Sequence, residues 1–379
     1  MKILSISNCP LAENSGSGYV ITNFCYGLQQ RGHDVDLFGP DSYEVLKFFK
    51  GRATHYRQTI GMFLFTKRQL TKKNYDIVEF YGGESWLIAR LLSRSRNKNK
   101  LLVSHSNGLE TYFYQTLIEG SQYGWVENPL AKWYQFNQSA WFKYAFTSVD
   151  AIVTVSENER NYAVKHQYQN EDRVMAIEPC LLKDYLGLTV EFERKKIIGY
   201  CGSWIARKGT KVISSDIPRL LVDFPDCVFQ LIGVGKSFNK EEYFPLELCS
   251  RIEVIPFVAN KEELKEIYKS LSILVVPSIY ESFGLVMPEA MACGCAIVAA
   301  KTGFVVSLKN NQEAVVLEQP CSPFLYEGVK QLLLNESLRQ EIAKNGYQRV
   351  QYLHWDWAVK QLEAQYISWL EEVRKESIK

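Results

Sequence analysis

Short apolar runs alternate with segments of helical periodicity along the first half of the chain. The run "KILSIS" predicts a strand, the glycine loop "ENSGSG" follows it, and apolar side chains then recur every fourth residue at Val20, Phe24 and Leu28, as on one face of a helix. The runs "RGHDVDLFG", "YDIVEFYGG", "KLLVSHSNG" and "DAIVTVSENER" predict further strands, each with a polar or glycine-bearing end. This alternation of strands and helices predicts a doubly wound parallel sheet.

The second half of the chain repeats the same alternation after a charged, mixed passage at 183–196, which predicts a linker. Its predicted strands are "KIIGYCGS", "CVFQLIGVG", "RIEVIPFV", "SILVVPS" and "CAIVAA". We therefore expect one α/β domain at 1–185 and a second at 195–355. A final amphipathic helix is expected at 356–376, because apolar side chains recur there at steps of three and four: Val359, Leu362, Tyr366, Trp369 and Val373.

Composition agrees with two domains, since 379 residues exceed the size at which one core keeps growing. The 44 Lys and Arg nearly balance the 42 Asp and Glu, so the overall charge gives no support to a nucleic-acid partner. The nine cysteines lack metal-ligand spacing and are interpreted as reduced thiols of a cytoplasmic protein. No apolar run approaches the ~18 residues of a membrane span, which predicts a protein that is soluble or peripheral at the membrane.

The loop "CGSWIARKGT" follows the first strand of the second half, at the sheet edge where parallel α/β folds bind ligands. Gly202 and Gly209 bracket the adjacent cations Arg207 and Lys208. Two cations at a junction between a loop and a helix suit a diphosphate. A solvated basic turn explains the same residues, and both interpretations stay open at this point.

Three features of the first half carry weaker signals. The loop at Gly16 and Gly18 lets a backbone approach a ligand, but Asn23 stands where a dinucleotide fingerprint has its last glycine, so a nicotinamide enzyme gains little support. The pair within Asp34–Asp36 lies in strand sequence and does not predict a metal site. His105 ends a strand and either donates a hydrogen bond to a reacting sugar or is structural.

The stretch "ESFGLVMPEAMACGCAIVAA" places two glutamates, Glu281 and Glu289, in apolar surroundings. Pro288 suits the first turn of a helix, so we expect a helix that begins around Met287 to Glu289 and ends near Gly294. Glu289 then lies in the first turn, where its charge favours the helix dipole. Glu281 precedes the helix and has no comparable structural explanation.

This Glu-x7-Glu motif resembles that of the retaining glycosyltransferase family 4, and the resemblance extends to "SGSG", "RGHDV", "DAIVTVSE", "RKG" and "ELKEIYKSLSILVVPS". It implies the GT-B fold, with two facing Rossmann-like domains and a C-terminal helix that crosses back to the N-terminal domain. It also implies metal-independent transfer of a hexose from a nucleotide diphosphate sugar, with UDP-sugar favoured over GDP-sugar. The N-terminal domain would then bind the acceptor, and no cofactor is expected.

The resemblance also assigns roles to single residues of the predicted donor site. Glu281 would contact hydroxyls of the transferred sugar, and Glu289 would accept hydrogen bonds from the ribose. The backbone of Phe283, Gly284 and Leu285 would face the sugar and the phosphate. The further assigned residues are Lys208 with Arg207 on the diphosphate, Val258 near the nucleobase, His105 beside the sugar, and Gly16, Ser17 and Gly18 as a floor beneath donor and acceptor.

The chain departs from the family pattern in two places. Ser203, after Gly202, replaces an arginine that is common there, and the resulting loop is similar to that of lipopolysaccharide-core glucosyltransferases. The segment Glu178–Cys180 replaces the usual Asn-Gly at the hinge between the domains.

The acceptor class stays open between a glycan, a lipid-linked molecule and a small molecule. Residues 43–73 hold eight Lys or Arg with interleaved phenylalanines, and residues 112–146 hold twelve aromatic residues. Either these segments contact the inner face of a membrane, or they are amphipathic helices with a core face and a solvated face. A sugar-nucleotide epimerase and a non-catalytic glycan-binding relative remain the alternative functions.

Overall fold

The computed structural model describes residues 1–12, 16–45, 51, 53–94, 99–120, 140–258 and 260–378. The chain divides into two compact units. Unit 1 comprises Met1–Gln115, Val126–Cys180 and Trp355–Lys379, and unit 2 comprises Thr116–Trp125 and Leu181–His354. No described helix combines the length and the apolar character needed to cross a bilayer.

Unit 1 is built on a six-stranded parallel sheet with the order β2-β1-β3-β4-β5-β6. A helix lies between each strand and the next one in the chain, as the alternating sequence pattern predicts. The elements that lie or begin in this unit are β1 (Lys2–Ser7), α1 (Gly16–Gln30), β2 (Asp34–Phe38), α2 (Ala53–Lys72), β3 (Ile77–Tyr81), α3 (Trp86–Ser93), β4 (Leu101–His105), α4 (Glu110–Glu119), β5 (Ala151–Thr154), α6 (Glu157–Lys165) and β6 (Val174–Ala176).

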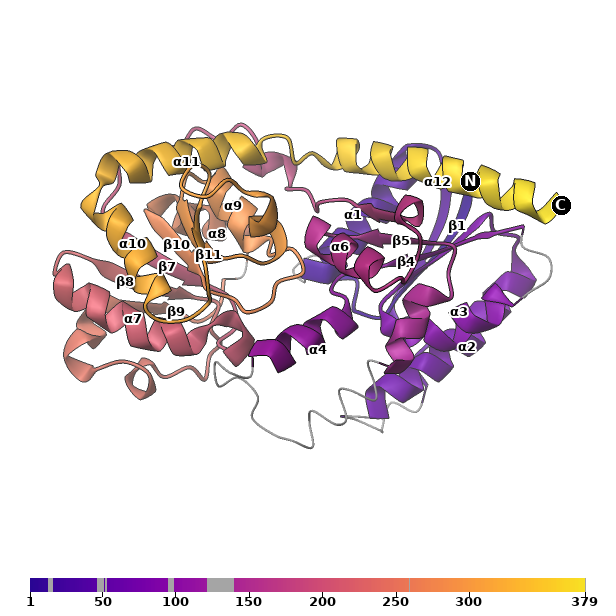
Figure 1. The fold of residues 1–379 in the computed structure, drawn as a ribbon, viewed down its shortest axis with the longest axis horizontal. Coiled ribbons are helices and arrows are strands. Elements are labelled where there is room, and N and C mark those ends of the chain that lie inside the picture. Colours follow the sequence, from indigo (N-terminus) through magenta and orange to yellow (C-terminus); the bar gives the residue numbers. More distant parts are fainter. Residues whose placement is uncertain are drawn as a thin grey trace. The chain divides into compact units, whose positions relative to one another are not determined.

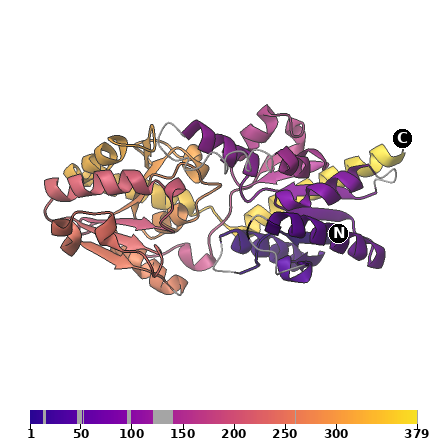
Figure 2. The same cartoon turned by 90° about the horizontal axis from the view of Figure 1, so that it is seen from below.

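The last helix, α12 (Trp355–Ile378), belongs to unit 1 and packs against α1. Its five predicted apolar positions are all buried, which confirms the amphipathic pattern. The two helices approach closely at Gly27, where an added Cβ would lie 2.4 Å from Val359 Cγ2. Both views draw α12 against the indigo and purple elements of this unit (Figures 1 and 2). The end of the chain therefore completes the core formed by its beginning.

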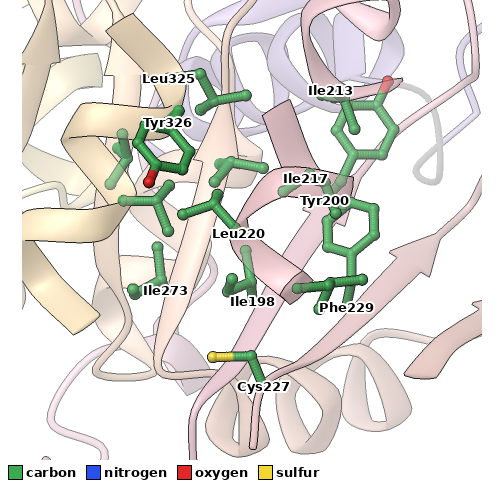
Figure 3. Close-up of a cluster of buried hydrophobic side chains, with 14 of the residues drawn as sticks. Ile198, Tyr200, Ile213, Ile217, Leu220, Cys227, Phe229, Ile273, Leu325 and Tyr326 are labelled. Atoms are coloured by element: carbon green, nitrogen blue, oxygen red, sulfur yellow. The ribbon is translucent and has the colours of Figure 1, made fainter. Parts of the chain in front are cut away.

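Unit 2 holds a second six-stranded parallel sheet, with the order β12-β11-β10-β7-β8-β9. Its central strands are flanked by an apolar cluster in which Tyr200, Leu220 and Phe229 meet side chains of the covering helices (Figure 3). The elements are β7 (Ile197–Cys201), α7 (Thr210–Asp223), β8 (Val228–Ile232), β9 (Ile252–Ile255), α8 (Lys261–Ser270), β10 (Ile273–Val276), α9 (Val286–Ala292), β11 (Ala296–Ala300), β12 (Val315–Leu317), α10 (Phe324–Leu334) and α11 (Glu336–Val350).

The observed architecture confirms the prediction of two parallel α/β sheets, with two local differences. Strands β6 and β12 are absent from the sequence prediction, because each has only three residues. The predicted linker is held on unit 2 rather than free: Arg194 donates to the carbonyl oxygens of Leu271 at 2.6 Å and of Cys293 at 2.5 Å. All nine cysteines are free, and six of them are buried, as expected for reduced thiols.

Candidate functional site

Glu281 and Lys208 form an ion pair at the sheet edge of unit 2. Lys208 follows β7 and Glu281 follows β10, and Lys208 Nζ lies 2.5 Å from Glu281 Oε1. The same oxygen accepts a hydrogen bond from Ser278 Oγ at 2.7 Å, and the backbone N–H of Glu281 donates to Thr302 Oγ1 at 3.0 Å. The Glu281 side chain is 7% exposed. Glu281 therefore has structural partners, and the expectation that it has no structural explanation is wrong.

The pair forms because the two loops are tied together. Ile279 N–H donates to the carbonyl oxygen of Arg207 at 2.9 Å. Gly209 adopts a left-handed φ of 76°, and an added Cβ would lie 2.1 Å from the carbonyl oxygen of Pro277. Only glycine tolerates both conditions at this position. Gly209 therefore lets the loop after β7 approach the loop after β10 closely enough for Lys208 to reach Glu281.

The loop between Glu281 and α9 is shaped by a second close approach. Gly284 has a φ of 87°, and Gly303 comes so close to the carbonyl oxygen of Phe283 that an added Cβ would lie 2.4 Å from it. Phe304 N–H donates to the same oxygen at 2.8 Å. The segment 283–285, predicted to face the sugar and phosphate, is thus held in an unusual conformation by glycines on two loops. Leu285 directly precedes α9.

Glu289 lies in the first turn of α9, as predicted, although the helix begins at Val286 rather than one to three residues later. Its Oε1 lies 2.6 Å from Lys261 Nζ. Burial raises the pKa of Glu289, and the charge and hydrogen bond of Lys261 oppose that rise. The rise in the pKa of Glu289 is therefore smaller than burial alone would give.

Lys261 was missed by the sequence reasoning. It is the first residue of α8, whose N-cap is Asn260: Asn260 Oδ1 accepts from Glu263 N at 2.8 Å. The sequence "NKEE" indicates a capped helix start, but only the folded structure brings its lysine to Glu289. Ser278 and Thr302 were missed for the same reason.

The remaining predicted donor residues lie on loops at the ends of β7 and β9. Gly202 has a φ of 143° and donates to the carbonyl oxygen of Ile232 at 2.8 Å. The carbonyl oxygen of the exposed Ser203 accepts from Tyr200 Oη at 2.8 Å. Val258 is half-buried. These residues share the sheet edge with Lys208, as expected for loops after parallel strands.

His105 lies in unit 1 at the end of β4 and is almost fully buried. Its Nε2 lies 2.5 Å from Tyr366 Oη and 3.4 Å from Glu79 Oε2. Tyr366 and Ser5 both donate to the Glu79 carboxylate. Burial alone would raise the pKa of Glu79, but hydrogen bonding and charge from His105, with the two hydroxyls, outweigh it and lower the pKa. Tyr366 and Glu79 thus give His105 a structural role within unit 1. The contact of His105 with a sugar stays a prediction.

The residues Gly16, Ser17 and Gly18 form the first turn of α1 rather than a loop. Residues 13–15 of the expected loop lie outside the described residues. An added Cβ at Gly18 would lie 2.6 Å from the carbonyl oxygens of Pro10 and Ala12. Close packing therefore requires this glycine, whatever its role toward a ligand. Among the described residues, no group of three or more His, Cys, Asp or Glu could hold a metal ion.

Comparisons with known proteins agree with this architecture. The family model described as Glycosyltransferase Family 4 matches residues 14–180, and the model described as Glycosyl transferases group 1 matches residues 189–349. An uncharacterized glycosyltransferase of Methanocaldococcus jannaschii is 27% identical over 82% of this chain and 79% of its own length.

Solved structures show the same fold. The sucrose-phosphate synthase of Thermosynechococcus elongatus superposes with a TM-score of 0.77 at 17% identity, over 97% of this chain and 99% of its own. WaaG, a glycosyltransferase involved in lipopolysaccharide biosynthesis, superposes with a TM-score of 0.67 at 15% identity, over 96% of this chain and 99% of its own. The two sheets, the Glu-x7-Glu loop and both family matches lead to one conclusion: the chain belongs to glycosyltransferase family 4 and has the GT-B fold.

Proposed function

We propose that this glycosyltransferase moves a hexose from a nucleotide diphosphate sugar, with UDP-sugar favoured, to a glycan, lipid-linked or small-molecule acceptor. The transfer retains the anomeric configuration and needs no metal ion. The observation that carries the proposal is the ion pair between Lys208 and Glu281 on two loops that are tied together. It supplies a cation for a leaving diphosphate beside a carboxylate for the hydroxyls of the transferred sugar.

Donor binding would exchange the partners of this pair. The diphosphate draws Lys208 away from Glu281, while Ser278 Oγ holds the carboxylate and Thr302 Oγ1 holds the backbone N–H of Glu281 in place. Glu281 then accepts hydrogen bonds from the sugar, and Lys208, with Arg207 beside it in the sequence, stabilises the negative charge that develops on the leaving phosphate. Glu281 is preorganised, because its side chain and backbone are held before the donor arrives.

Retention follows from attack on the same face of the sugar that the leaving group departs from. The bond from the anomeric carbon to the phosphate oxygen breaks, the bond to the acceptor oxygen forms, and the acceptor proton passes to the departing phosphate. In this proposal Glu281 binds the sugar hydroxyls, and Glu289 is paired with Lys261 and binds the ribose. Neither carboxylate is then left to act as the nucleophile of a double displacement, which favours the front-face route.

A nucleotide-sugar screen tests the proposal. The protein is incubated with UDP- and GDP-sugars, with and without acceptor extracts and with EDTA, and free nucleotide diphosphate and the anomeric configuration of the product are measured. Acceptor-dependent release of nucleotide and an α product from an α donor are expected, unchanged by EDTA. An epimerised donor without transfer would favour the epimerase, and no turnover of any donor would favour the glycan-binding relative.

The proposal places the protein in the cytoplasm, in peripheral contact with the inner face of the membrane through α2. This helix exposes Tyr56, Ile60 and Leu64 at steps of four, and the exposed Lys67 and Arg68 follow them. Apolar and basic side chains on one helix suit an anionic bilayer. Residues 46–50 and 52 of the predicted basic segment, and residues 121–139 of the aromatic one, lie outside the described residues.

Sedimentation with phosphatidylglycerol vesicles tests this contact. Lys73 is a poor residue to neutralise, because it lies 2.8 Å from Asp34 Oδ1 and 2.7 Å from Asp36 Oδ2. The variant Lys67→Gln/Arg68→Gln is expected to lose most of the bound fraction, since each basic residue near an anionic surface contributes about 1 kcal/mol. Equal binding by this variant and the wild type would contradict the membrane contact.

The roles of His105, Val258 and Gly16–Gly18 toward donor and acceptor are part of the same proposal. They rest on the family resemblance.

A further inference from the structure

Unit 1 contains a cavity of about 210 Å³ that the donor chemistry does not use. It is lined by residues from α2, α3 and the helical segment 140–147: His55, Tyr56, Thr59, Trp86, Trp141 and Phe142. Helices α2 and α3 lie side by side (Figure 1) and contact each other. The indole rings of Trp86 and Trp141 have centroids 5.0 Å apart. Four of the six lining residues are aromatic, and Tyr56 and Trp141 remain 56% and 48% exposed.

The cavity has one charged edge, formed by His55 and Glu84. His55 Nδ1 lies 2.7 Å from Glu84 Oε1, and Asn8 Nδ2 donates to Glu84 Oε2 at 2.8 Å. Glu84 is 3% exposed, whereas the His55 side chain is 41% exposed. An ionised carboxylate only accepts hydrogen bonds, so His55 donates from Nδ1. Its Nε2 is then the ring atom available to a ligand.

A second carboxyl group, that of Glu110, lies beside the His55–Glu84 pair. The backbone N–H of Gly83 donates to Glu110 Oε1 at 3.0 Å, which places Glu110 beside the Glu84 loop. Burial, and then the charge on Glu84, raise the pKa of Glu110 to about 8. Glu110 therefore carries its proton at neutral pH and adds no negative charge beside the His55–Glu84 pair.

The position of the cavity also indicates a ligand site. Glu84 and Gly83 follow β3, and Asn8 follows β1, so the charged edge stands at the carboxyl ends of the parallel strands, where open α/β sheets bind ligands. Phe142 packs so closely on Gly83 that an added Cβ would lie 2.3 Å from its Cγ. The glycine thus lets an aromatic wall of the cavity reach the strand end.

The aromatic lining of the cavity and the His55–Glu84 pair at its edge together indicate which class of ligand it binds. A hydrocarbon chain would contact the aromatic walls, but it would cover the imidazole of His55 without offering a hydrogen bond, which is costly. A free anion would meet the carboxylate of Glu84. A sugar ring has an apolar C–H face for an aromatic side chain and hydroxyl groups for a histidine nitrogen, which matches the usual composition of small-ligand sites.

We propose that this cavity binds one hydroxylated sugar ring of the acceptor, with a ring face against Trp141 and a hydroxyl donating to His55 Nε2. The proposal rests on the proposed function, because a transferase to glycans needs an acceptor subsite. His55 orients the acceptor here, and Glu84 positions His55.

Binding of methyl glycosides, measured without any donor, tests the subsite. Methyl α-glucopyranoside, methyl α-mannopyranoside and methyl β-galactopyranoside are titrated while the indole N–H signals are followed by NMR, with 1-octanol as the hydrocarbon probe. The Trp141 signal is assigned with Trp141→Phe. A saturable shift of this signal with at least one glycoside is expected. No shift with any glycoside, or a shift with octanol alone, would overturn the proposal.

Substitutions define the contacts. His55→Phe keeps an aromatic ring but removes the acceptor nitrogen, and it is expected to weaken glycoside binding about tenfold, the effect of one lost hydrogen bond of about 1.4 kcal/mol. Glu84→Gln is expected to weaken it as well, because a glutamine amide can donate to the ring and reverse the orientation of His55. Trp357→Phe is the matched control, since Trp357 is 44% exposed on α12 and does not line the cavity.

These measurements separate the two proposals. Glycoside binding that depends on His55, in a protein that turns over no donor, would support the subsite and contradict the proposed transfer. Donor turnover with acceptor extracts, but wild-type glycoside affinity in His55→Phe, would support the transfer and overturn the subsite. The melting temperature of each variant is measured as a control for retention of the fold.

Discussion

Two clusters that the sequence marked as catalytic differ in how they are held. The Lys208–Glu281 pair of unit 2 lies on two loops, and the lysine side chain keeps 17% of its surface exposed. The His105–Tyr366–Glu79 cluster of unit 1 is closed, with side-chain exposures of 3% for His105 and 0% for Glu79. The first can exchange its partner for a ligand with little disruption, whereas the second must break a buried network. From this difference we predict that the first pair serves the chemistry and that the second cluster contributes mainly to the stability of unit 1.

The largest expected effect tests the open pair. Glu281→Gln and Lys208→Met should each lower the transfer rate by at least about 100-fold, because each removes a charge aligned with the reacting sugar phosphate. Steady-state rates of nucleotide release measure the loss. Lys301→Met serves as the control, since Lys301 is an exposed lysine directly after β11. Near wild-type transfer by Glu281→Gln would contradict the role of the Lys208–Glu281 pair in the reaction.

The fold could be predicted from the sequence because its signals are local. Buried parallel strands are continuous apolar runs, and the helices between them show a period near 3.6. The last helix was predicted down to its buried positions, including Tyr366 and Trp369. Strands β6 and β12 were not predicted, because three residues are too few to show the apolar run of a buried strand. The packing of Arg194 on unit 2 also has no local signal, since it depends on carbonyl groups about 80 and 100 residues away.

The site could be predicted only in part. Glu281, Glu289 and Lys208 were found through a motif and a charged loop, but their actual partners were not. Ser278, Thr302 and Lys261 have no feature that distinguishes them in the sequence, and their roles arise from loops that meet at the sheet edge. The same holds for His105, whose partner Tyr366 lies 261 positions away.

A smaller effect tests the closed cluster. Tyr366→Phe removes the hydroxyl between His105 and Glu79 and should lower the free energy of unfolding by about 1–3 kcal/mol, because two buried polar groups lose a partner. Urea denaturation measures the change. Tyr26→Phe is the control, since Tyr26 is 59% exposed on α1 of the same unit. Equal stability of the two variants would show that the cluster does not hold the fold.

The stability of Tyr366→Phe should also depend on pH differently from that of the wild type. The pKa of Glu79 is lowered from its ordinary value of 4.5, so its contribution to stability is present above that pH and is lost as the pH falls through the lowered pKa. Tyr366 is one of the groups that lower it. In Tyr366→Phe the loss on acidification should therefore begin at a higher pH than in the wild type. Denaturation curves between about pH 3 and 7 follow it.

The smallest effect concerns Glu289, the second carboxylate of unit 2. It is buried, as in the His105 cluster, but its ion-pair partner is accessible to solvent, as in the Lys208–Glu281 pair. Glu289 is as buried as Glu281, but its lysine is 37% exposed. Burial raises the pKa of Glu289 and Lys261 opposes the rise, as does a hydrogen bond from Tyr268, while Asp184 adds to it. Lys261→Met should thus raise this pKa further.

The proposed ribose contact needs the ionised form of Glu289, so the acid loss of UDP affinity in Lys261→Met should move to higher pH. The affinity should also fall at any pH where the raised pKa leaves more of Glu289 protonated than in the wild type. Calorimetric titration with UDP at several pH values measures both changes. Lys269→Met is the matched control, because Lys269 lies on the same helix and pairs with Glu266. A weaker affinity without any shift of the pH profile would mean that Lys261 contacts the nucleotide itself and does not act through Glu289.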